Sequence, residues 1–272
     1  MTSATAELSH RSPTSTPPRR RNILRKAVPP VAAIVGLVAL WWVIVAVFSI
    51  PKYIVPSPLD VLGSFQDDYS TLLANLWPTV LEAVFGFLAG NIVAIALAVI
   101  FVHWKTAERA FFPVAVFIRT VPIVAIAPIL VVILGYGYSP KIIIAALISF
   151  FPTLVNMVRG LQAVDKQSLE LLRVLSASRR EVFFKVRIFA SLPYLFSALK
   201  IAATSSVIGA IVAEWVGSQQ GLGYLIIQAT YNFQVPLLWA TMIVASIFAT
   251  LFFAVIGIIE KLVVTWDAKE AA

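Results

Sequence analysis

The amino-acid sequence predicts an all-α integral membrane protein with six transmembrane helices. Hydrophobic residues make up 60% of the 272 residues and charged residues only 12%, and the apolar residues are concentrated in long stretches. Soluble domains contain about 45–50% apolar and about 25% charged residues. A helix of ~20 apolar residues, rising about 1.5 Å per residue, is long enough to cross a ~30 Å hydrocarbon core. We therefore expect one helical bundle in a membrane.

Two regions are expected along the chain. Residues 1–26 are rich in Ser, Thr and Pro, contain a run of three arginines, and are expected to form a disordered basic cytosolic tail. Residues 27–272 are expected to form the transmembrane domain. No small-x-small cleavage pattern follows its first apolar stretch, which favours a retained span over a secretory signal. The spans are expected near 29–49, 77–102, 111–134, 141–158, 193–213 and 237–260, with a large loop at 159–192.

Three prolines, Pro113, Pro122 and Pro128, interrupt the third of these spans. Proline removes a backbone donor and kinks a helix. Within lipid, the freed carbonyl groups must find partners inside the protein. We therefore expect a kinked third helix that faces the interior of the bundle.

The Lys and Arg residues predict the orientation of the chain. With the N-terminus in the cytosol, nearly all of the 21 fall on the inner side, whereas only Lys52 and Lys141 fall outside. This asymmetry favours two cytoplasmic termini and an even number of spans. The formal charge of +8 does not indicate nucleic-acid binding, because the charges cluster in loops between apolar spans.

The loop at 159–192 is basic and amphipathic. Ala177-Ser178 allows a break in it, and residues 181–188 are expected to form a second short helix. An amphipathic helix of this kind can insert its apolar side into a groove on a partner or rest on lipid headgroups, and the pattern alone leaves both open. Leucines recur at helical spacing along the first half of the loop: Leu169, Leu172 and Leu175.

The same loop resembles the EAA signature of bacterial ABC-importer permeases. The resemblance is carried by Glu170-Leu171-Leu172, by Ser176 six positions after the glutamate, and by Ile188 and Pro193. The chain departs from the signature in two places, because the signature has Ala-Ala after the glutamate and Gly in place of Ser176. The second departure places a serine where a turn would favour glycine.

Other segments resemble the nitrate/sulfonate/taurine/thiamine-precursor branch of this family, and the resemblance covers roughly Leu76 to Trp266. It implies a type I ABC importer permease-like bundle with a cytosolic coupling helix at about Ser168 to Ala177. The segments are Ile118-Arg119-Thr120-Val121-Pro122 with Ala127-Pro128, Leu134 to Gly137, Phe150 to Asn156, Val212-Ala213-Glu214-Trp215 and Gly221 to Ile226.

The resemblance further implies a permease subunit of the bacterial plasma (inner) membrane that catalyses no chemistry itself. Its implied partners are a second copy of the permease in a homodimer, two ATP-binding cassette ATPase subunits, an extracytoplasmic solute-binding protein and the lipid bilayer. ATP and Mg would be bound by the ATPase, since this chain has no Gly-x-x-x-x-Gly-Lys-Ser/Thr motif. The residues implied in coupling to the ATPase are Glu170, Leu171, Leu172, Leu175, Ser176, Ala177 and Ser178.

Polar residues within the spans are candidates for lining the solute pathway, because ionisable groups there are costly and often functional. Arg119 would face a substrate anion or pair with Glu82, which itself would otherwise reach headgroup water. Lys200 is expected to reach the inner interface by snorkelling. The pathway candidates are Arg119, Asn91, Ser205, Ser206 and Glu214.

Each of these candidates also has a structural interpretation. Asn91 lies beside Gly86 and Gly90, a pattern typical of close helix packing. Ser205 and Ser206 belong to a small polar stretch that would form either a pathway wall or a tight helix contact. Glu214 would gate the pathway, dock the binding protein, or cap the Gly-rich turn that follows it.

The substrate class stays open between a nitrate/sulfonate/taurine-type anion and a pyrimidine/riboflavin-type vitamin precursor. The segment Asn232 to Leu238 lacks an acidic element that we associate with the oxyanion members, so it looks closer to the second kind. The alternative function is a secondary transporter driven by an ion gradient, but we see no convincing internal repeat. With no cysteine and no convergent histidines, neither a disulfide nor a metal site is expected.

Overall fold

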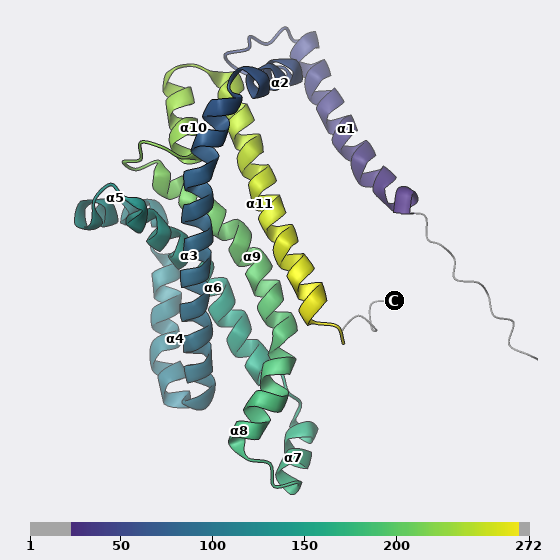
Figure 1. The fold of residues 1–272 in the computed structure, drawn as a ribbon, viewed down its shortest axis with the longest axis vertical. Coiled ribbons are helices and arrows are strands. Elements are labelled where there is room, and N and C mark those ends of the chain that lie inside the picture. Colours follow the sequence, from purple (N-terminus) through teal and green to yellow (C-terminus); the bar gives the residue numbers. More distant parts are fainter. Residues whose placement is uncertain (1–22, 267–272) are drawn as a thin grey trace, which may run out of the picture. The chain divides into compact units, whose positions relative to one another are not determined.

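A computed structural model describes residues 23–266, and these contain helices but no strand (Figure 1). Of the predicted tail, residues 1–22 lie outside the described part, and the first helix begins at Ile23. The helices are α1 (Ile23–Val47), α2 (Pro58–Asp67), α3 (Tyr69–His103), α4 (Lys105–Thr120), α5 (Ile123–Leu134), α6 (Tyr138–Gln162), α7 (Lys166–Val174), α8 (Arg179–Val182), a π-helical turn (Phe183–Arg187), α9 (Ile188–Glu214), α10 (Leu222–Tyr231) and α11 (Val235–Val263).

The chain forms two compact units, Met1–Ser49 and Ile50–Ala272. Within the second unit, four helical segments are long and apolar enough to cross a membrane: α3, α6, α11 and the continuous stretch Arg179–Glu214. The pair α4 and α5 makes a fifth if it is counted as one broken span. The first unit contributes α1, whose apolar part, Val31–Val47, is shorter. The all-helical membrane fold is confirmed, whereas the six-span count is not.

The third predicted span is broken rather than kinked. Helix α4 ends at Thr120 and α5 begins at Ile123, and their axes differ by 94°, so α5 lies across the direction of α4 (Figure 1). Pro122 stands directly before α5, and its carbonyl accepts the first bond of that helix, from Ala125. The other two prolines lie inside continuous helices. Only Pro122 therefore acts as the breaking residue.

Helices α3, α6 and α9 form the centre of the second unit, and small residues hold them close together. Ala83, Ala145 and Ala210 are completely buried in one cluster where the three helices meet. A Cβ atom added at Gly90 would meet the Ser149 hydroxyl at 2.6 Å. The predicted packing role of Asn91 agrees with this contact surface, because Asn91 is 4% exposed and accepts a hydrogen bond from the Thr153 hydroxyl.

The loop after α6 contains α7, as predicted, but the second short helix predicted at 181–188 is not a separate element. Ser178 caps α8 through a capping box with Glu181, and the helix then continues without interruption through the π-helical turn into α9. Ile188 keeps helical angles of φ −59° and ψ −50°. The predicted separate helix is therefore the first part of a segment that extends from Arg179 to Glu214.

Candidate functional site

Helix α7 is capped at both ends by its own loop. At its start, the Asp165 carboxylate accepts a hydrogen bond from the Ser168 amide at 2.7 Å. Hydrogen bonds from the side chain and then the backbone of Ser168 hold the pKa of Asp165 below its usual value. At its end, Ser176 donates to the Arg173 carbonyl and Ala177 donates to the Leu172 carbonyl, both at 2.9 Å. This pair of bonds is a Schellman motif.

Ser176 adopts the backbone conformation that the motif normally gives to glycine. Its φ is +56°, in the left-handed region, where a Cβ atom approaches the following carbonyl oxygen at a cost of roughly 1–2 kcal/mol. The serine in place of glycine therefore leaves the turn intact but makes it strained.

The apolar residues of α7 lie on two sides of the helix. Leu169 and Leu172 are half-buried, whereas Leu171, Val174 and Leu175 are 60%, 81% and 67% exposed. No residue of α7 is fully buried. Of the other residues predicted to couple, Glu170, Ser176 and Ser178 are exposed and Ala177 is half-buried. The exposed side of α7 is therefore an apolar surface that the rest of the described chain leaves uncovered.

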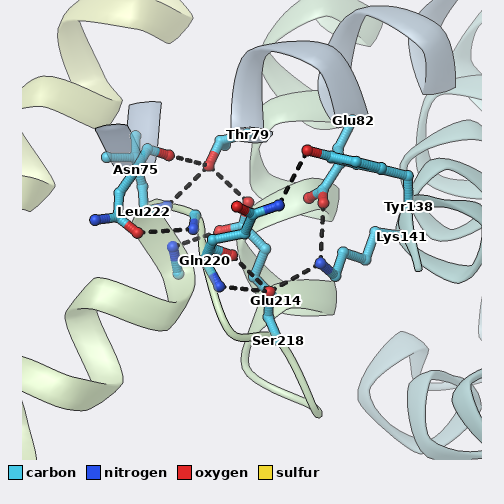
Figure 2. Close-up of polar contacts among 11 residues, drawn as sticks. Asn75, Thr79, Glu82, Tyr138, Lys141, Glu214, Ser218, Gln220 and Leu222 are labelled. Carbon is cyan, nitrogen blue, oxygen red and sulfur yellow. Dashed lines mark hydrogen bonds and ion pairs between the residues drawn. The ribbon is translucent and has the colours of Figure 1, made fainter. Parts of the chain in front are cut away.

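A second group of polar residues, drawn in Figure 2, lies around the start of α10, at the opposite end of the second unit from α7 (Figure 1). Its centre is an ion pair of 3.0 Å between Lys141, at the start of α6, and Glu82 of α3, with side chains 4% and 0% exposed. Lys141 also donates to the Ser218 hydroxyl at 2.8 Å. Of the two alternatives for Arg119, an ion pair with Glu82 is not found among the described residues, because Glu82 pairs with Lys141. Lys141, counted on the outer side, is buried at the start of α6.

Glu214 belongs to the same group and caps the start of α10. Its carboxylate accepts hydrogen bonds from the Gly223 amide at 2.5 Å and from the Thr79 hydroxyl at 2.6 Å. The Leu222 amide donates to Thr79, and the Gly221 amide donates to Asn75 (Figure 2). Three amide groups at a helix start would otherwise lack partners, and the carboxylate suits the positive end of the helix dipole. Of the three interpretations of Glu214, the structure shows the capping contact.

Sequence reasoning missed Lys141, Thr79 and Asn75 as members of this group. For Lys141 a signal was present, because Glu82 lies in one predicted span and Lys141 opens another at the same predicted side of the membrane. Thr79 and Asn75 carried no comparable signal, since their partners lie more than 100 residues away in sequence.

Arg119 lies just before the break between α4 and α5 and lines a cavity of about 300 Å³ together with Phe151 and Ser205. Its guanidinium group is 4.7 Å from the centre of the Phe151 ring, a cation–π distance. Among residues 23–266 no carboxylate forms an ion pair with it. Arg119 and Ser205 are thus brought together at one cavity.

The other pathway candidates are not at this cavity. Asn91 is buried in the contact between α3 and α6, and Ser206 is completely buried and donates to the carbonyl of Ala203 in its own helix. Lys200, predicted to reach the inner interface, forms an ion pair of 2.7 Å with Glu260 of α11.

Comparisons with known proteins match most of the chain. The profile of the family described as binding-protein-dependent transport system inner membrane component matches residues 86–266. A formylaminopyrimidine transport permease protein of Halalkalibacterium halodurans is 31% identical over 246 residues, which cover 90% of this chain and 98% of the relative. A riboflavin transport system permease protein of Chloroflexus aurantiacus is 30% identical, covering 93% and 96%. A nitrate import permease protein of Synechocystis is 27% identical, covering 93% and 97%.

Proposed function

Because the chain belongs to the family of binding-protein-dependent transport system inner membrane components, and is an ABC importer permease of that family, we propose that it forms the path through which an ATP-driven complex imports a small solute. The solute would be delivered by an extracytoplasmic binding protein. Two copies of the chain would form the path, and two ATPase subunits, which hold the ATP and Mg, would bind beneath them. The chain itself would catalyse no reaction.

The observation that carries this proposal is the exposed apolar surface of α7, formed by Leu171, Val174 and Leu175. An amphipathic helix that leaves such a surface uncovered is suited to a groove on a partner protein. The basic residues around α7 favour a cytoplasmic position for this end of the bundle, with both termini on the same side. Each ATPase would therefore grip one α7.

For the solute, we propose a pyrimidine- or riboflavin-type vitamin precursor, with a nitrate- or sulfonate-type anion as the second candidate. Two relatives at 30% identity or above carry formylaminopyrimidine and riboflavin in their names, and the nitrate permease is less similar. The cavity at Arg119 and Phe151 suits a planar ring with a polar edge, through stacking and hydrogen bonds. Arg119 and Ser205 are the residues that we propose to line the path.

The docking surface is tested by changing charge on α7. Glu170→Lys is expected to abolish co-purification of the ATPase subunits with the solubilised permease, because it reverses an exposed charge next to Leu171 and one helical turn before Val174. Glu108→Lys is the matched control, since Glu108 also lies at the predicted inner side, in the first turn of α4, and its side-chain polar contacts among the described residues are with Lys105 and Gln162. Both variants should elute as folded proteins in gel filtration.

Val174→Asp gives an independent second test, because this side chain is 81% exposed and its replacement therefore removes little internal packing. It should also release the ATPase. If the ATPase remains bound to both α7 variants, and its ATP hydrolysis still responds to the solute, the docking site is elsewhere.

A further inference from the structure

A cleft of about 480 Å³ lies between the end of α3, helix α7 and the turn that leads from α8 into α9. Three arginines line it, Arg173 from α7, Arg179 from α8 and Arg187 from the π-helical turn, together with His103 at the end of α3. No acidic residue lines it. The cleft thus brings together three positive charges, from α7, from α8 and from the π-helical turn.

These charges have no counter-charge in the part of the chain that the structure describes. None of the three arginines takes part in any of the ion pairs found among residues 23–266. The nearby carboxylate of Glu181 is already engaged by Lys185 at 3.2 Å and by the Ser178 hydroxyl at 2.9 Å. Like charges placed together without compensation favour an anion from outside the chain.

Part of the cleft is held in place before any ligand arrives. Arg187 donates to the carbonyl of Leu161 at 3.1 Å. His103 contacts the carbonyl of Val99 at 2.8 Å, and its ring lies 4.7 Å from the Phe183 ring. Helix α7 has no fully buried residue, so a ligand that bridges Arg173 to Arg187 would attach it to the transmembrane helices.

The position of the cleft indicates what kind of anion it accepts. His103, which lines the cleft, is the last residue of the apolar helix α3. The next residue, Trp104, is 66% exposed, as is typical of aromatic residues at a membrane interface. The walls of the cleft also include the apolar side chains of Val102, Val182 and Phe183. One arginine guanidinium group can bind two phosphate oxygens at once. Basic pockets between helices at the cytoplasmic side of membrane proteins bind anionic lipid headgroups.

We propose that this cleft binds a phosphate-bearing anion, supplied by the headgroup of an anionic phospholipid. The site goes beyond the proposed transport function, because it does not use the exposed apolar surface of α7. The cleft is lined by Leu169, Arg173 and Ala177 of the loop, whereas the surface proposed to meet the ATPase is formed by Leu171, Val174 and Leu175. The two surfaces can therefore be tested separately.

The test uses the purified full chain without ATPase, in neutral detergent, titrated with short-chain phosphatidylglycerol or phosphatidylcholine and followed by native mass spectrometry. Removing Arg173 and Arg179 together, as R173Q/R179Q, should weaken phosphatidylglycerol binding roughly thirtyfold, about fivefold per charge. The matched control is K166Q/R180Q, which also removes one charge from α7 and one from α8 at positions that do not line the cleft. The control should bind as the unmodified chain does.

Three results would overturn the proposal: equal binding of the two lipids by the unmodified chain, equal losses in both double variants, or no loss in either. The single variant R173Q, at an exposed position, repeats the test if the double variant does not fold. A separate titration with inorganic phosphate distinguishes the source. If millimolar phosphate displaces phosphatidylglycerol from the unmodified chain but not from R173Q/R179Q, the same site is filled by a soluble phosphate. If phosphate does not displace the lipid, the lipid headgroup is the source.

Discussion

Lys141→Met removes the cation from an almost completely buried ion pair. The Glu82 side chain is 0% exposed, its ion-pair partner among the described residues is Lys141 at 3.0 Å, and the Glu214 carboxyl lies within hydrogen-bonding reach of it. The variant therefore leaves this buried pair of carboxyl groups without its cation. Breaking a buried pair in this way costs about 3–5 kcal/mol of folding free energy, a large part of the stability of an ordinary domain.

The double variant Lys141→Met with Glu82→Leu separates the charge from the packing. It removes both charges and leaves apolar side chains of similar size, which is often close to neutral for stability. We expect it to recover most of the loss and to lie within about 1.5 kcal/mol of the unmodified chain. Both variants are measured by equilibrium unfolding in mixed micelles, with helix content as the signal.

Either of two results would contradict this role of the Lys141–Glu82 pair. If Lys141→Met lowers the free energy of unfolding by less than about 1 kcal/mol, the pair is not the main compensation for Glu82. If the double variant is as unstable as the single one, the loss comes from packing around α3 and α6 rather than from an unpaired charge.

Three further changes test local features of the fold. Ser176→Gly should remove the strain of the positive φ. The net stabilisation of about 0.5–1 kcal/mol should slow amide exchange at Ala177; faster exchange would show that Ser176 is not strained. Hydrogen bonds from Ser57 lower the pKa of Asp60, so this cap of α2 should persist above about pH 4 and be lost as the pH falls through the lowered value. The loss should appear as falling protection factors in α2, corrected for the pH dependence of exchange in unprotected amides, in a series from about pH 6 to about pH 2; unchanged protection factors would contradict it. Gly223→Ala should destabilise the start of α10 by about 1–3 kcal/mol, because the added Cβ would meet that of Glu214 at 2.9 Å, and unchanged thermal unfolding would refute that contact.

Features set by local sequence could be predicted, and these include most of the fold. The long apolar stretches gave the positions of α3, α6, α9 and α11 because hydropathy and helix length act within one segment. Pro122 indicated the interruption of the third span for the same reason, although its 94° bend depends on how α5 packs. The leucine spacing located α7. The prediction of a separate second short helix was wrong, because the helix that begins after the capping box at Ser178 continues to Glu214.

The polar group at α10 could not be predicted in the same way, because its contacts join distant parts of the chain. Glu214 left three interpretations open, and the choice depended on which amide groups lay beside it. Lys141 was placed outside by counting charges per loop, a method that assigns a side of the membrane but not a depth. Burial of Lys141 becomes evident only when α3 and α6 are set side by side and the carboxylate of Glu82 faces it.

The two polar regions of the second unit are connected by a single helical segment. It begins at Arg179, in the basic cleft beside α7, and ends at Glu214, which caps α10 at the opposite end (Figure 1). At about 1.5 Å per residue its 36 residues span about 54 Å. Because the segment contains no break, a tilt imposed at its α7 end must either bend it or move Glu214. The points at which a helix bends most easily are the π-helical turn Phe183–Arg187 and Pro193, and both lie toward the α7 end. A rigid remainder would carry the displacement to α10, so the two ends are mechanically linked through α9.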